Sequence, residues 1–513
     1  MRTPRFLAFL LAVFIGGTSL FAAGFRLAAP ISDHMVLQRE KPIAVWGWAE
    51  AGESVTVAFA GQSKSANADA DGKWTLKLDA LPASAEPRTL VVTGKDGHKI
   101  EVKDVLVGEV WLGSGQSNMA MNVQSSNNFD AEKSAANYPL IRHYQEASTH
   151  AEQPQAEGKG SWKACTPENV GGFSAVLYFF GREIHKEVGV PVGLVNTSVG
   201  GTPIESWVAA EAQSSHPETK ANFDAQLKAY QAFDAAKATA LYEKQLAAWK
   251  ITTAKAKAAK TELPRKPYDP IAIRKFKGGP AGLYNGKVAN LAPYTLRGML
   301  WYQGEGNAGN AGLYDKQLSQ LVTSWRTLWS DEVPFAWVQL PNYRDSDSES
   351  WPRIRESMMK VLALPKTGMA ITLDIGDPKD IHPKNKQDVG KRLSYWALAT
   401  VYDRKVPAIS GPLPAAHHVE GAAIRVTLRH ADGLRTRDGA APRGFLIAGA
   451  DKIWKPATAR LDGAAVLISS PDVPAPVAAR YAWAENPDGN LVNGAGLPAT
   501  SFRTDTWPDP AAK

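Results

Sequence analysis

The sequence predicts an α/β protein whose central domain is a three-layer, flavodoxin-like unit with a five-stranded parallel sheet, flanked by N-terminal and C-terminal β-sandwich-like modules. Across residues 104–403, short apolar runs alternate with helical periods, which is typical of parallel strands joined by crossover helices. Across residues 25–103 and 404–513, short alternating runs are separated by Gly, Asp and Pro turns, as in β modules. A chain of 513 residues is also too long for a single core.

Residues 1–23 have the pattern of a secretory signal peptide. Arg2 and Arg5 precede an apolar run at 6–15, and small residues follow at 22–24. The apolar run is too short for a comfortable membrane span, and no later run reaches that length. We therefore expect an exported protein, periplasmic or secreted, with no membrane partner after cleavage. Cys165 is the only cysteine, so no intramolecular disulfide can form.

The composition is that of an ordinary soluble protein, with 44% hydrophobic and 21% charged residues. The formal net charge is +7, but Lys and Arg are scattered, with a local excess at 237–277. A nucleic-acid-binding protein would show a basic stripe within a recognisable motif, and this chain shows none, so we expect no nucleic-acid partner. The charge is compatible with an anionic substrate or surface. The sequence does not predict an oligomeric state.

The elements are predicted in order along the chain. Strands of the N-terminal module are expected at 42–48, 54–59, 74–78 and 89–93, and those of the C-terminal module at 423–428, 444–448, 464–468 and 478–483. The central sheet is expected at 105–112, 192–196, 296–302, 335–340 and 369–373, with helices at 174–187, 314–329 and 387–402. A helical insertion occupies 209–277. Its segment 222–259 has apolar residues at helical spacing, which predicts a helical hairpin with its charges in solvent. Plain packing of this hairpin is favoured over its acting as a lid on the site.

The turn after the first strand of the central sheet is predicted to carry a nucleophile. In residues 104–122, a buried-strand pattern breaks into a Gly-Ser-Gly turn and then into a helix-compatible segment. This places Ser117 at the carboxyl end of a strand and near a helix N-terminus, where backbone N–H groups favour negative charge. Ligands of open α/β sheets bind at that edge, and four later strand ends also carry polar residues. Met119 distinguishes this turn from the GxSxG elbow of α/β-hydrolases.

A nucleophilic serine needs a base and a group that orients the base. Among ten histidines, His382 is the one that follows the last predicted sheet strand with carboxylates close by, so it is predicted to be the base. Asp380, Asp377 and Asp374 lie in the same loop, and each is a candidate for the orienting acid. Aspartate is also common in loops and helix caps for purely structural reasons.

Several short motifs resemble those of the sialate O-acetylesterase-like carbohydrate esterases of the SGNH hydrolase superfamily. They are GQSNM at 115–119, GGTPIESW at 200–207, LYNG at 283–286, WYQGE at 301–305, DIHPK at 380–384, RYAW at 480–483 and NP at 486–487. The resemblance implies removal of O-acetyl groups from a sugar through an acetyl-serine intermediate, without a metal or other cofactor. It favours Asp380 as the acid, with Asp377 second. SGNH enzymes commonly have DxxH at this point, whereas Lys379 stands three residues before His382.

An oxyanion hole is expected from the backbone N–H groups of Ser117 and of Gly200 or Gly201, together with a side-chain amide at the end of the third strand. SGNH enzymes use Asn for that amide, and here both Gln303 and Asn307 are candidates. Losing one such donor costs about 3–4 kcal/mol of transition-state stabilisation.

Three more motif residues are candidates for substrate contacts: Gln116, Asn118 and Glu305. The sequence leaves the substrate open between an O-acetylated sialic acid and acetylated hemicellulose such as xylan or xyloglucan. A basic patch beside Ser117 would favour the carboxylated sialic acid, and a long aromatic groove would favour a polysaccharide. A non-catalytic sugar-binding protein is a weaker alternative.

Overall fold

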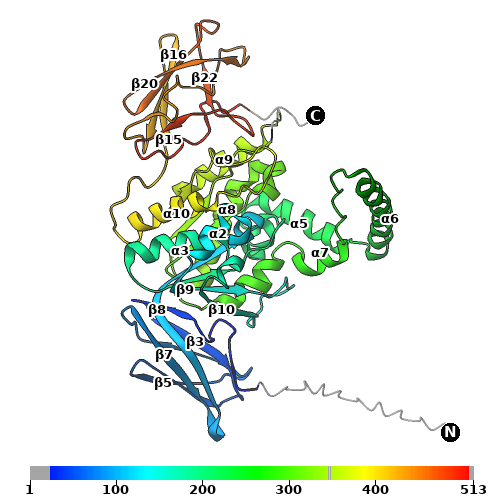
Figure 1. The fold of residues 1–513 in the computed structure, drawn as a ribbon, viewed down its shortest axis with the longest axis vertical. Helices are drawn as coiled ribbons and strands as arrows, with labels where there is room; N and C mark the ends of the chain where they lie inside the picture. The colour runs from blue at the N-terminus through cyan, green and yellow to red at the C-terminus, as the bar shows by residue number, and fades with distance from the viewer. Residues whose placement is uncertain (1–23, 345, 347, 508–513) are drawn as a thin grey trace, which may run out of the picture.

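The computed structural model describes residues 24–344, 346 and 348–507, so the predicted signal peptide lies outside the described residues. Three sets of sheets follow one another along the long axis of the molecule, with the N-terminal strands at one end, the α/β unit in the middle and the C-terminal strands at the other end (Figure 1). Within the described ranges, no helix combines the length and apolar character needed to cross a membrane.

The N-terminal part contains two groups of strands. One is a three-stranded antiparallel sheet in the order β1(Arg26–Leu27), β3(Ile43–Trp48) and β6(Lys73–Leu78). In the other, β4(Ser54–Phe59) pairs with β5(Gln62–Asn67) and β7(Ser84–Thr93), while β2(Val36–Gln38) and β7 pair with β8(Lys99–Gly115). Trp46 and Trp74 are completely buried between these strands, as expected for large apolar rings in a small core.

Strand β8 is shared by the N-terminal part and the α/β unit. It runs for 17 residues; its first half pairs with β7, and its second half pairs with β11(Val192–Asn196) and β12(Gly298–Tyr302). The predicted domain boundary at 103/104 therefore falls inside one continuous strand. Every residue from Val105 to Gly115 is buried, which explains the unbroken apolar run in the sequence.

The central sheet is wider than predicted. Its order is β10(Gly160–Cys165), β9(Tyr138–Glu146), β11, β8, β12, β13(Phe335–Val338) and β14(Thr367–Ala370). The strands from β9 to β14 along this order are parallel, and β10 is antiparallel to β9. All five predicted strands are present, but the count of five is wrong because β9 and β10 were missed. β9 buries Arg142, His143 and Glu146, so its sequence lacks the apolar run expected of a buried strand.

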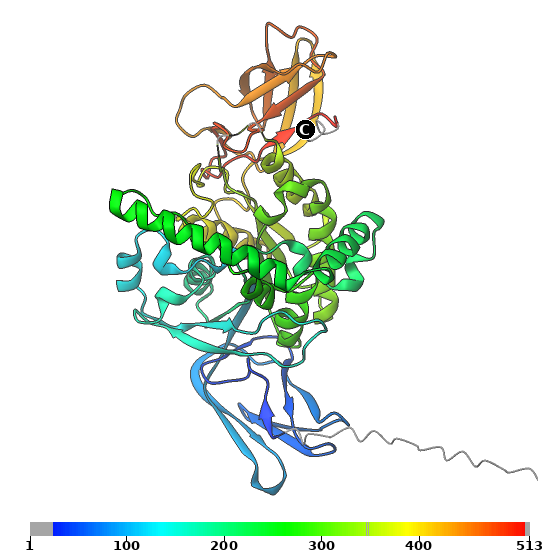
Figure 2. The same ribbon diagram turned by 90° about the vertical axis from the view of Figure 1, so that its right-hand side faces the viewer.

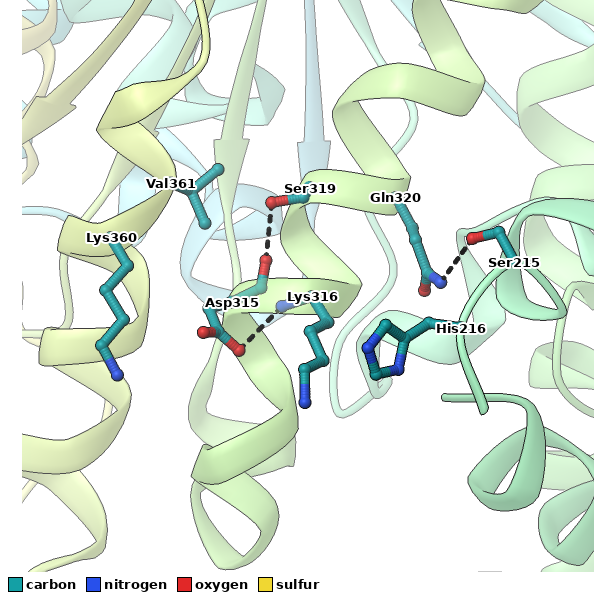
Figure 3. Close-up of a pocket in the computed structure, with 8 residues that line it drawn as sticks. All are labelled: Ser215, His216, Asp315, Lys316, Ser319, Gln320, Lys360 and Val361. Atoms are coloured by element: carbon teal, nitrogen blue, oxygen red, sulfur yellow. Dashed lines mark hydrogen bonds between the residues drawn. The ribbon is translucent and has the colours of Figure 1, made fainter. Parts of the chain in front are cut away.

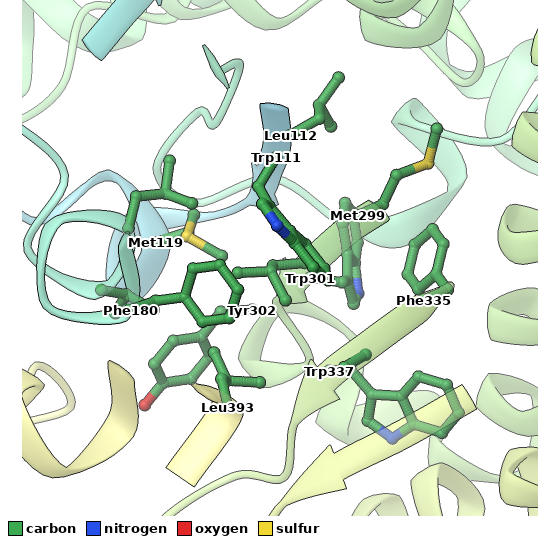
Figure 4. Close-up of a cluster of buried hydrophobic side chains, with 14 of the residues drawn as sticks. Trp111, Leu112, Met119, Phe180, Met299, Trp301, Tyr302, Phe335, Trp337 and Leu393 are labelled. Carbon is green, nitrogen blue, oxygen red and sulfur yellow. The ribbon is translucent and has the colours of Figure 1, made fainter. Parts of the chain in front are cut away.

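Helices pack on both faces of this sheet. On one face, Trp111 of β8 contacts Phe180 of α3(Ala175–Val188) and Trp396 of α10(Lys386–Thr400), with ring centroids 4.9 and 6.3 Å apart. On the other face, Trp301 of β12 lies 6.0 Å from Trp325 of α8(Tyr314–Trp329), and α9(Ser350–Lys360) packs beside α8. Figure 4 shows part of this core. Two short helices, α1(Ser117–Ala120) and α2(Phe129–Ser134), follow β8.

The insertion contains four helices: α4(Ala210–Gln213), α5(Pro217–Gln231), α6(Ala235–Ala259) and α7(Pro270–Lys277). Both predicted helices of segment 222–259 are present. Helix α6 packs against α7, and Ala256 is the one buried residue along its length. Helix α6 stands away from the α/β unit in Figure 1 and crosses in front of it in Figure 2.

The C-terminal part is built from antiparallel strands, as predicted. The strand order of one sheet is β15(Leu413–Glu420), β16(Ala423–Arg429), β21(Ala465–Ser469) and β20(Thr458–Asp462). The strand order of the second sheet is β19(Lys455–Pro456), β18(Phe445–Ala448), β22(Ala478–Tyr481) and β24(Phe502–Arg503). A third, two-stranded sheet pairs β17(Arg435–Thr436) with β23(Leu491–Val492). Arg355 of α9 anchors this part, because its fully buried guanidinium donates to the carbonyls of Leu340, Pro341, Ala484 and Glu485.

A buried carboxylate joins the N-terminal part to the base of the sheet. Glu109 of β8 is completely buried and forms ion pairs with Arg39, which follows β2, and with Arg297, which precedes β12. Tyr402, beyond α10, also donates to Glu109, with an O–O distance of 3.1 Å. Three distant segments of the chain therefore depend on one negative charge.

We expect Glu109→Gln to lower the free energy of unfolding by about 3 kcal/mol, because removing one partner leaves two largely buried guanidinium groups without compensation. Glu40→Gln is the matched control, since Glu40 contacts the same two arginines but its side chain is 57% exposed. The control should change stability by less than about 0.5 kcal/mol. Chemical denaturation followed by tryptophan fluorescence measures both, and equal losses in the two variants would contradict this account.

Candidate active site

A cavity of about 550 Å³ opens at the carboxyl ends of the central strands. It is bounded by the loops that follow β8, β11, β12 and β14, which is the edge predicted to bind ligand, and by the end of the insertion. Its lining residues are Gln116, Ser117, Gly200, Gly201, Arg265, Tyr268, Ile273, Lys277, Glu305, Gly306, Ile381 and His382.

The turn that carries Ser117 requires glycine. Gly115, the last residue of β8, has φ +137°, and a Cβ there would lie 2.1 Å from the carbonyl oxygen of Tyr302 in β12. The amide of Gln116 then donates to that same carbonyl at 3.0 Å. The chain can therefore leave the sheet sharply and present Ser117 as the first residue of α1.

His382 is in position to act as the base. Its Nε2 lies 2.8 Å from Ser117 Oγ, which is hydrogen-bond distance. Burial lowers the pKa of His382 below its ordinary value, with Lys386 and Arg265 adding to the effect and Asp380 opposing it. A depressed pKa keeps the imidazole neutral at physiological pH, which is the form able to accept the serine proton.

Of the three candidate acids, Asp380 is the one that contacts His382. Its Oδ1 lies 3.7 Å from His382 Nδ1 and accepts the backbone N–H of His382 at 2.9 Å. Asp377 instead accepts the backbone N–H of Lys379, and Asp374 forms a two-pronged ion pair with Arg392. Asp380 is therefore placed to orient the imidazole. Long contacts of this kind in an unliganded active site commonly shorten when substrate binds, and the 3.7 Å between Asp380 Oδ1 and His382 Nδ1 is such a contact.

The glycine loop after β11 lies against Ser117. A Cβ at Gly200 would be 3.4 Å from Ser117 Cβ, and both Gly200 and Gly201 line the cavity. The carbonyl of Gly201 accepts from Lys277 Nζ at 2.9 Å, which ties this loop to the end of α7. The loop can thus approach a reacting carbonyl group closely.

The two candidates for the side-chain amide of the oxyanion hole, Gln303 and Asn307, do not line the cavity. Gln303 is fully buried and donates to Thr202 O and Asn307 Oδ1, at 3.2 and 2.8 Å. Asn307 is also buried, and its amide nitrogen donates to Glu205 Oε2 at 2.9 Å. The two amides hold the loop after β12 against the loop after β11.

Two of the three candidate substrate-contact residues reach the cavity. Gln116 lines the cavity, and its Oε1 accepts a hydrogen bond from the backbone N–H of Gly306 at 3.2 Å. The NH₂ group of the same side chain therefore does not take part in the contact with Gly306. Glu305 also lines the cavity, and burial raises the pKa of its carboxyl. Asn118 is fully buried behind Ser117 and does not line the cavity.

Four lining residues come from the insertion and were missed. Arg265 and Tyr268 lie in the loop before α7, where the guanidinium stacks 4.6 Å from the centre of the Tyr268 ring, while Ile273 and Lys277 belong to α7. All four lie beyond segment 222–259, the predicted hairpin, so it is the end of the insertion that reaches the cavity. The local excess of Lys and Arg at 237–277 was the available signal.

A second pocket, drawn in Figure 3, has none of this chemistry. It lies between the start of α8, the end of α9 and the start of α5. Its histidine, His216, accepts the backbone N–H of Glu218 as the cap of α5, and Ser319 Oγ donates to the carbonyl of Asp315. Across the described residues, no group of three or more His, Cys, Asp or Glu side chains could hold a metal ion.

A serine paired with a histidine and a neighbouring carboxylate, at the carboxyl edge of a mostly parallel sheet, is the arrangement that hydrolysis by a serine nucleophile requires. Residues 107–248 and 272–398 match the family model for "Carbohydrate esterase, sialic acid-specific acetylesterase". The sialate O-acetylesterase of Rattus norvegicus is 32% identical over 464 residues, covering 81% of this chain and 80% of the relative. That of Homo sapiens is 31% identical over 437 residues, covering 76% and 74%.

A solved structure agrees with these relatives. The crystal structure of a carbohydrate acetylesterase from Xanthomonas citri superimposes with a TM-score of 0.79 and 36% identity, covering 94% of this chain and all of that chain. The chain therefore belongs to the family of sialic acid-specific acetylesterases among the carbohydrate esterases, and it is a carboxylic ester hydrolase. The predicted family and enzyme class are confirmed. Arg265 and Tyr268 fall in the segment between the two ranges that match the family model.

The site predicts a specific pH dependence. Activity should fall as the pH drops through the pKa of His382, at a pH below the ordinary histidine range, because only the neutral imidazole accepts the proton of Ser117. Asp380→Asn removes a charge that favours the imidazolium, so it should lower this pKa further and reduce kcat. Asp377→Asn is the control. Profiles of kcat/KM against pH that respond to Asp377→Asn but not to Asp380→Asn would make Asp377 the acid.

Proposed function

We propose that this protein removes O-acetyl groups from an acidic sugar of the sialic acid class through an acetyl-Ser117 intermediate. The observation that carries the proposal is the 2.8 Å contact between Ser117 Oγ and His382 Nε2 inside a cavity that Gly200 and Gly201 also line. This arrangement supplies a nucleophile, a base and backbone donors in one place, as acyl transfer requires.

In the acylation step, His382 takes the proton of Ser117 while Oγ attacks the acetyl carbonyl carbon. The tetrahedral oxyanion is stabilised by the N–H groups of Ser117 and of the Gly200-Gly201 loop. Gln116 is the only lining residue with a side-chain amide, and its NH₂ group is the candidate for the third donor. The bond between the acetyl carbon and the sugar oxygen then breaks, and the imidazolium gives its proton to that oxygen, which leaves as the sugar hydroxyl.

Deacylation repeats these roles with water. His382 removes a proton from a water molecule, whose oxygen attacks the acetyl carbon of acetyl-Ser117, and the collapse of the second oxyanion releases acetate and restores Ser117 Oγ–H. Asp380 keeps the imidazole oriented through both steps and stabilises its protonated form.

Two cations at the cavity support an anionic sugar. Arg265 is exposed at its mouth, and Lys277 is half-buried at its wall, where burial lowers the pKa of its amine. A guanidinium can bind a carboxylate through two parallel hydrogen bonds. Sialic acids carry such a carboxylate, whereas acetylated xylan and xyloglucan backbones are neutral.

The direct test is acetate release by the protein from O-acetylated sialic acid, acetylated xylan, acetylated xyloglucan and a small aryl acetate, with Ser117→Ala alongside. We expect release from sialic acid and from the aryl acetate, and loss of at least about 10⁴-fold in kcat on Ser117→Ala. Acetate release from xylan or xyloglucan but not from the sialic acid would leave the proposed mechanism in place and change the assigned substrate. A folded protein that cleaves none of the esters would point to a sugar-binding role.

The substrate assignment has its own test. Arg265→Gln should raise KM for the acetylated sialic acid by about 10-fold or more, because a charge-assisted hydrogen bond contributes about 1.5–3 kcal/mol. The neutral aryl acetate should be cleaved with unchanged KM, measured above pH 8 so that His382 stays neutral. Lys266→Gln, an exposed neighbour that does not line the cavity, is the matched control. Equal KM values for Arg265→Gln and the control would remove Arg265 from substrate binding.

A further inference from the structure

Three polar residues in or just after the motifs have no part in the chemistry described above, yet they meet directly behind Ser117. They are Asn118 of the GQSNM motif, Glu305 of the WYQGE motif and Lys386, just after the DIHPK motif. Asn118 and Lys386 are completely buried. Polar groups in such positions are costly unless they are fully hydrogen-bonded, so their arrangement calls for a physical reason.

Asn118 is the centre of the cluster. Its Nδ2 donates to Glu305 Oε1 at 2.5 Å and to the carbonyl of Ile381 at 2.9 Å. Its Oδ1 accepts from Lys386 Nζ at 2.6 Å. Lysine can only donate and the carbonyl can only accept, so the orientation of the Asn118 amide is fully determined.

The contacts of Asn118 connect the three loops that form the reaction centre. Asn118 directly follows the nucleophile in α1, Glu305 begins the segment after β12, and Lys386 is the first residue of α10. Ile381, whose carbonyl Asn118 holds, directly precedes His382. One side chain adjacent to Ser117 therefore fixes the backbone adjacent to His382.

The charges in the cluster explain why it resists rearrangement. Burial raises the pKa of Glu305 and lowers that of Lys386 to about 7, and each charge partly offsets the other. Lys386 Nζ also lies 5.1 Å from the centre of the Tyr302 ring. If the His382 loop and the start of α10 moved away from Ser117, Lys386 and the carbonyl of Ile381 would both lose their hydrogen bonds to Asn118 inside the protein, which costs more than losing a surface contact.

We propose that Glu305, Asn118 and Lys386 form a positioning network that holds the His382 loop against the Ser117 turn and so sets the distance between Oγ and Nε2. The proposal rests on the role of Ser117 given under Proposed function. None of the three residues touches the reacting atoms through this network. They act by keeping a base and a nucleophile in register, where a displacement of about 1 Å can cost 100-fold in rate.

The test uses Asn118→Leu and Lys386→Met with the small aryl acetate, which does not depend on sugar recognition. Both should lower kcat by about 100-fold while KM changes less than about threefold. Lys386→Met should also move the acid limb of kcat/KM to higher pH, because the Lys386 charge disfavours the imidazolium. Of the other charged groups around His382, Arg265 acts in the same direction and Asp380 in the opposite one, and both remain in this variant.

Asn490→Leu is the matched control. Asn490 is also fully buried, but it lies in the C-terminal part. Its Nδ2 donates to the carboxylate of Asp438 and to the carbonyl of Ala441, and its Oδ1 accepts from the backbone N–H of Arg443. The Asn490→Leu variant should have a lower free energy of unfolding, with kcat and the pH profile of kcat/KM unchanged. If Asn118→Leu does not fold, as judged by near-ultraviolet circular dichroism, Glu305→Met and Glu305→Gln take its place. Glutamine retains an acceptor for Asn118 Nδ2, so it should recover at least tenfold of the kcat lost in the methionine variant.

Two results would overturn the proposal. The first is a folded Asn118→Leu or Lys386→Met variant whose kcat is within threefold of that of the unaltered protein. The second is a fall in kcat/KM in these variants that comes entirely from a higher KM, which would indicate contact with the substrate. Ser117→Ala in the same assay separates the two hypotheses. If Ser117→Ala stays active, the proposed function fails, whereas if it is inactive and the Asn118 and Lys386 variants are normal, only the network fails.

Discussion

The pairing of β8 with its two parallel neighbours is the constraint on which the rest of the structure depends. Gly113 lies opposite Asn196 of β11 and Leu300 of β12, and Gly115 lies opposite Tyr302. This register brings the loops after three strands to one level, so that the nucleophile, the glycine loop and the segment of Glu305 meet. Because side chains alternate between faces, a shift of one residue would turn Trp111 away from α3 and α10 and would separate the sheet from its helices.

The interior of the protein contains several charges that balance one another. Glu109 compensates Arg39 and Arg297, Glu146 of β9 pairs with Lys287, and Arg480 pairs with Asp505. In each case, residues from different elements of the chain contribute the opposite charges. Such pairs add little net stability compared with apolar packing, but they are costly to separate, and they therefore favour one arrangement of the elements over its alternatives. The cluster around Asn118 applies the same principle beside the reaction centre.

Much of the fold and the core of the site could be predicted because the signals are local. An unbroken apolar run followed by Gly-Ser-Gly indicates β8 and its turn, and the position of His382 after the last strand indicates the base. Strand β9 could not be recognised, because the charges of Arg142 and Glu146 are compensated by partners distant in sequence, Asp104 and Lys287. The contacts of Gln303 and Asn307 could not be predicted for a related reason. Their position at a strand end was predicted, but the direction of their amides depends on the loop after β11.

The separation of the insertion from the sheet has a consequence for the evolution of this enzyme. Ser117 and His382, the proposed nucleophile and base, are held in place by strand register and buried charge, so we expect substitutions around them to disturb the reaction. Arg265, Tyr268 and Lys277 reach the same cavity from a segment whose long helix α6 has little contact with the core. Natural selection can therefore alter the length and charge of this arm while leaving bond cleavage intact, and a single ancestral scaffold could diversify toward sugars of different charge by exchanging one peripheral segment.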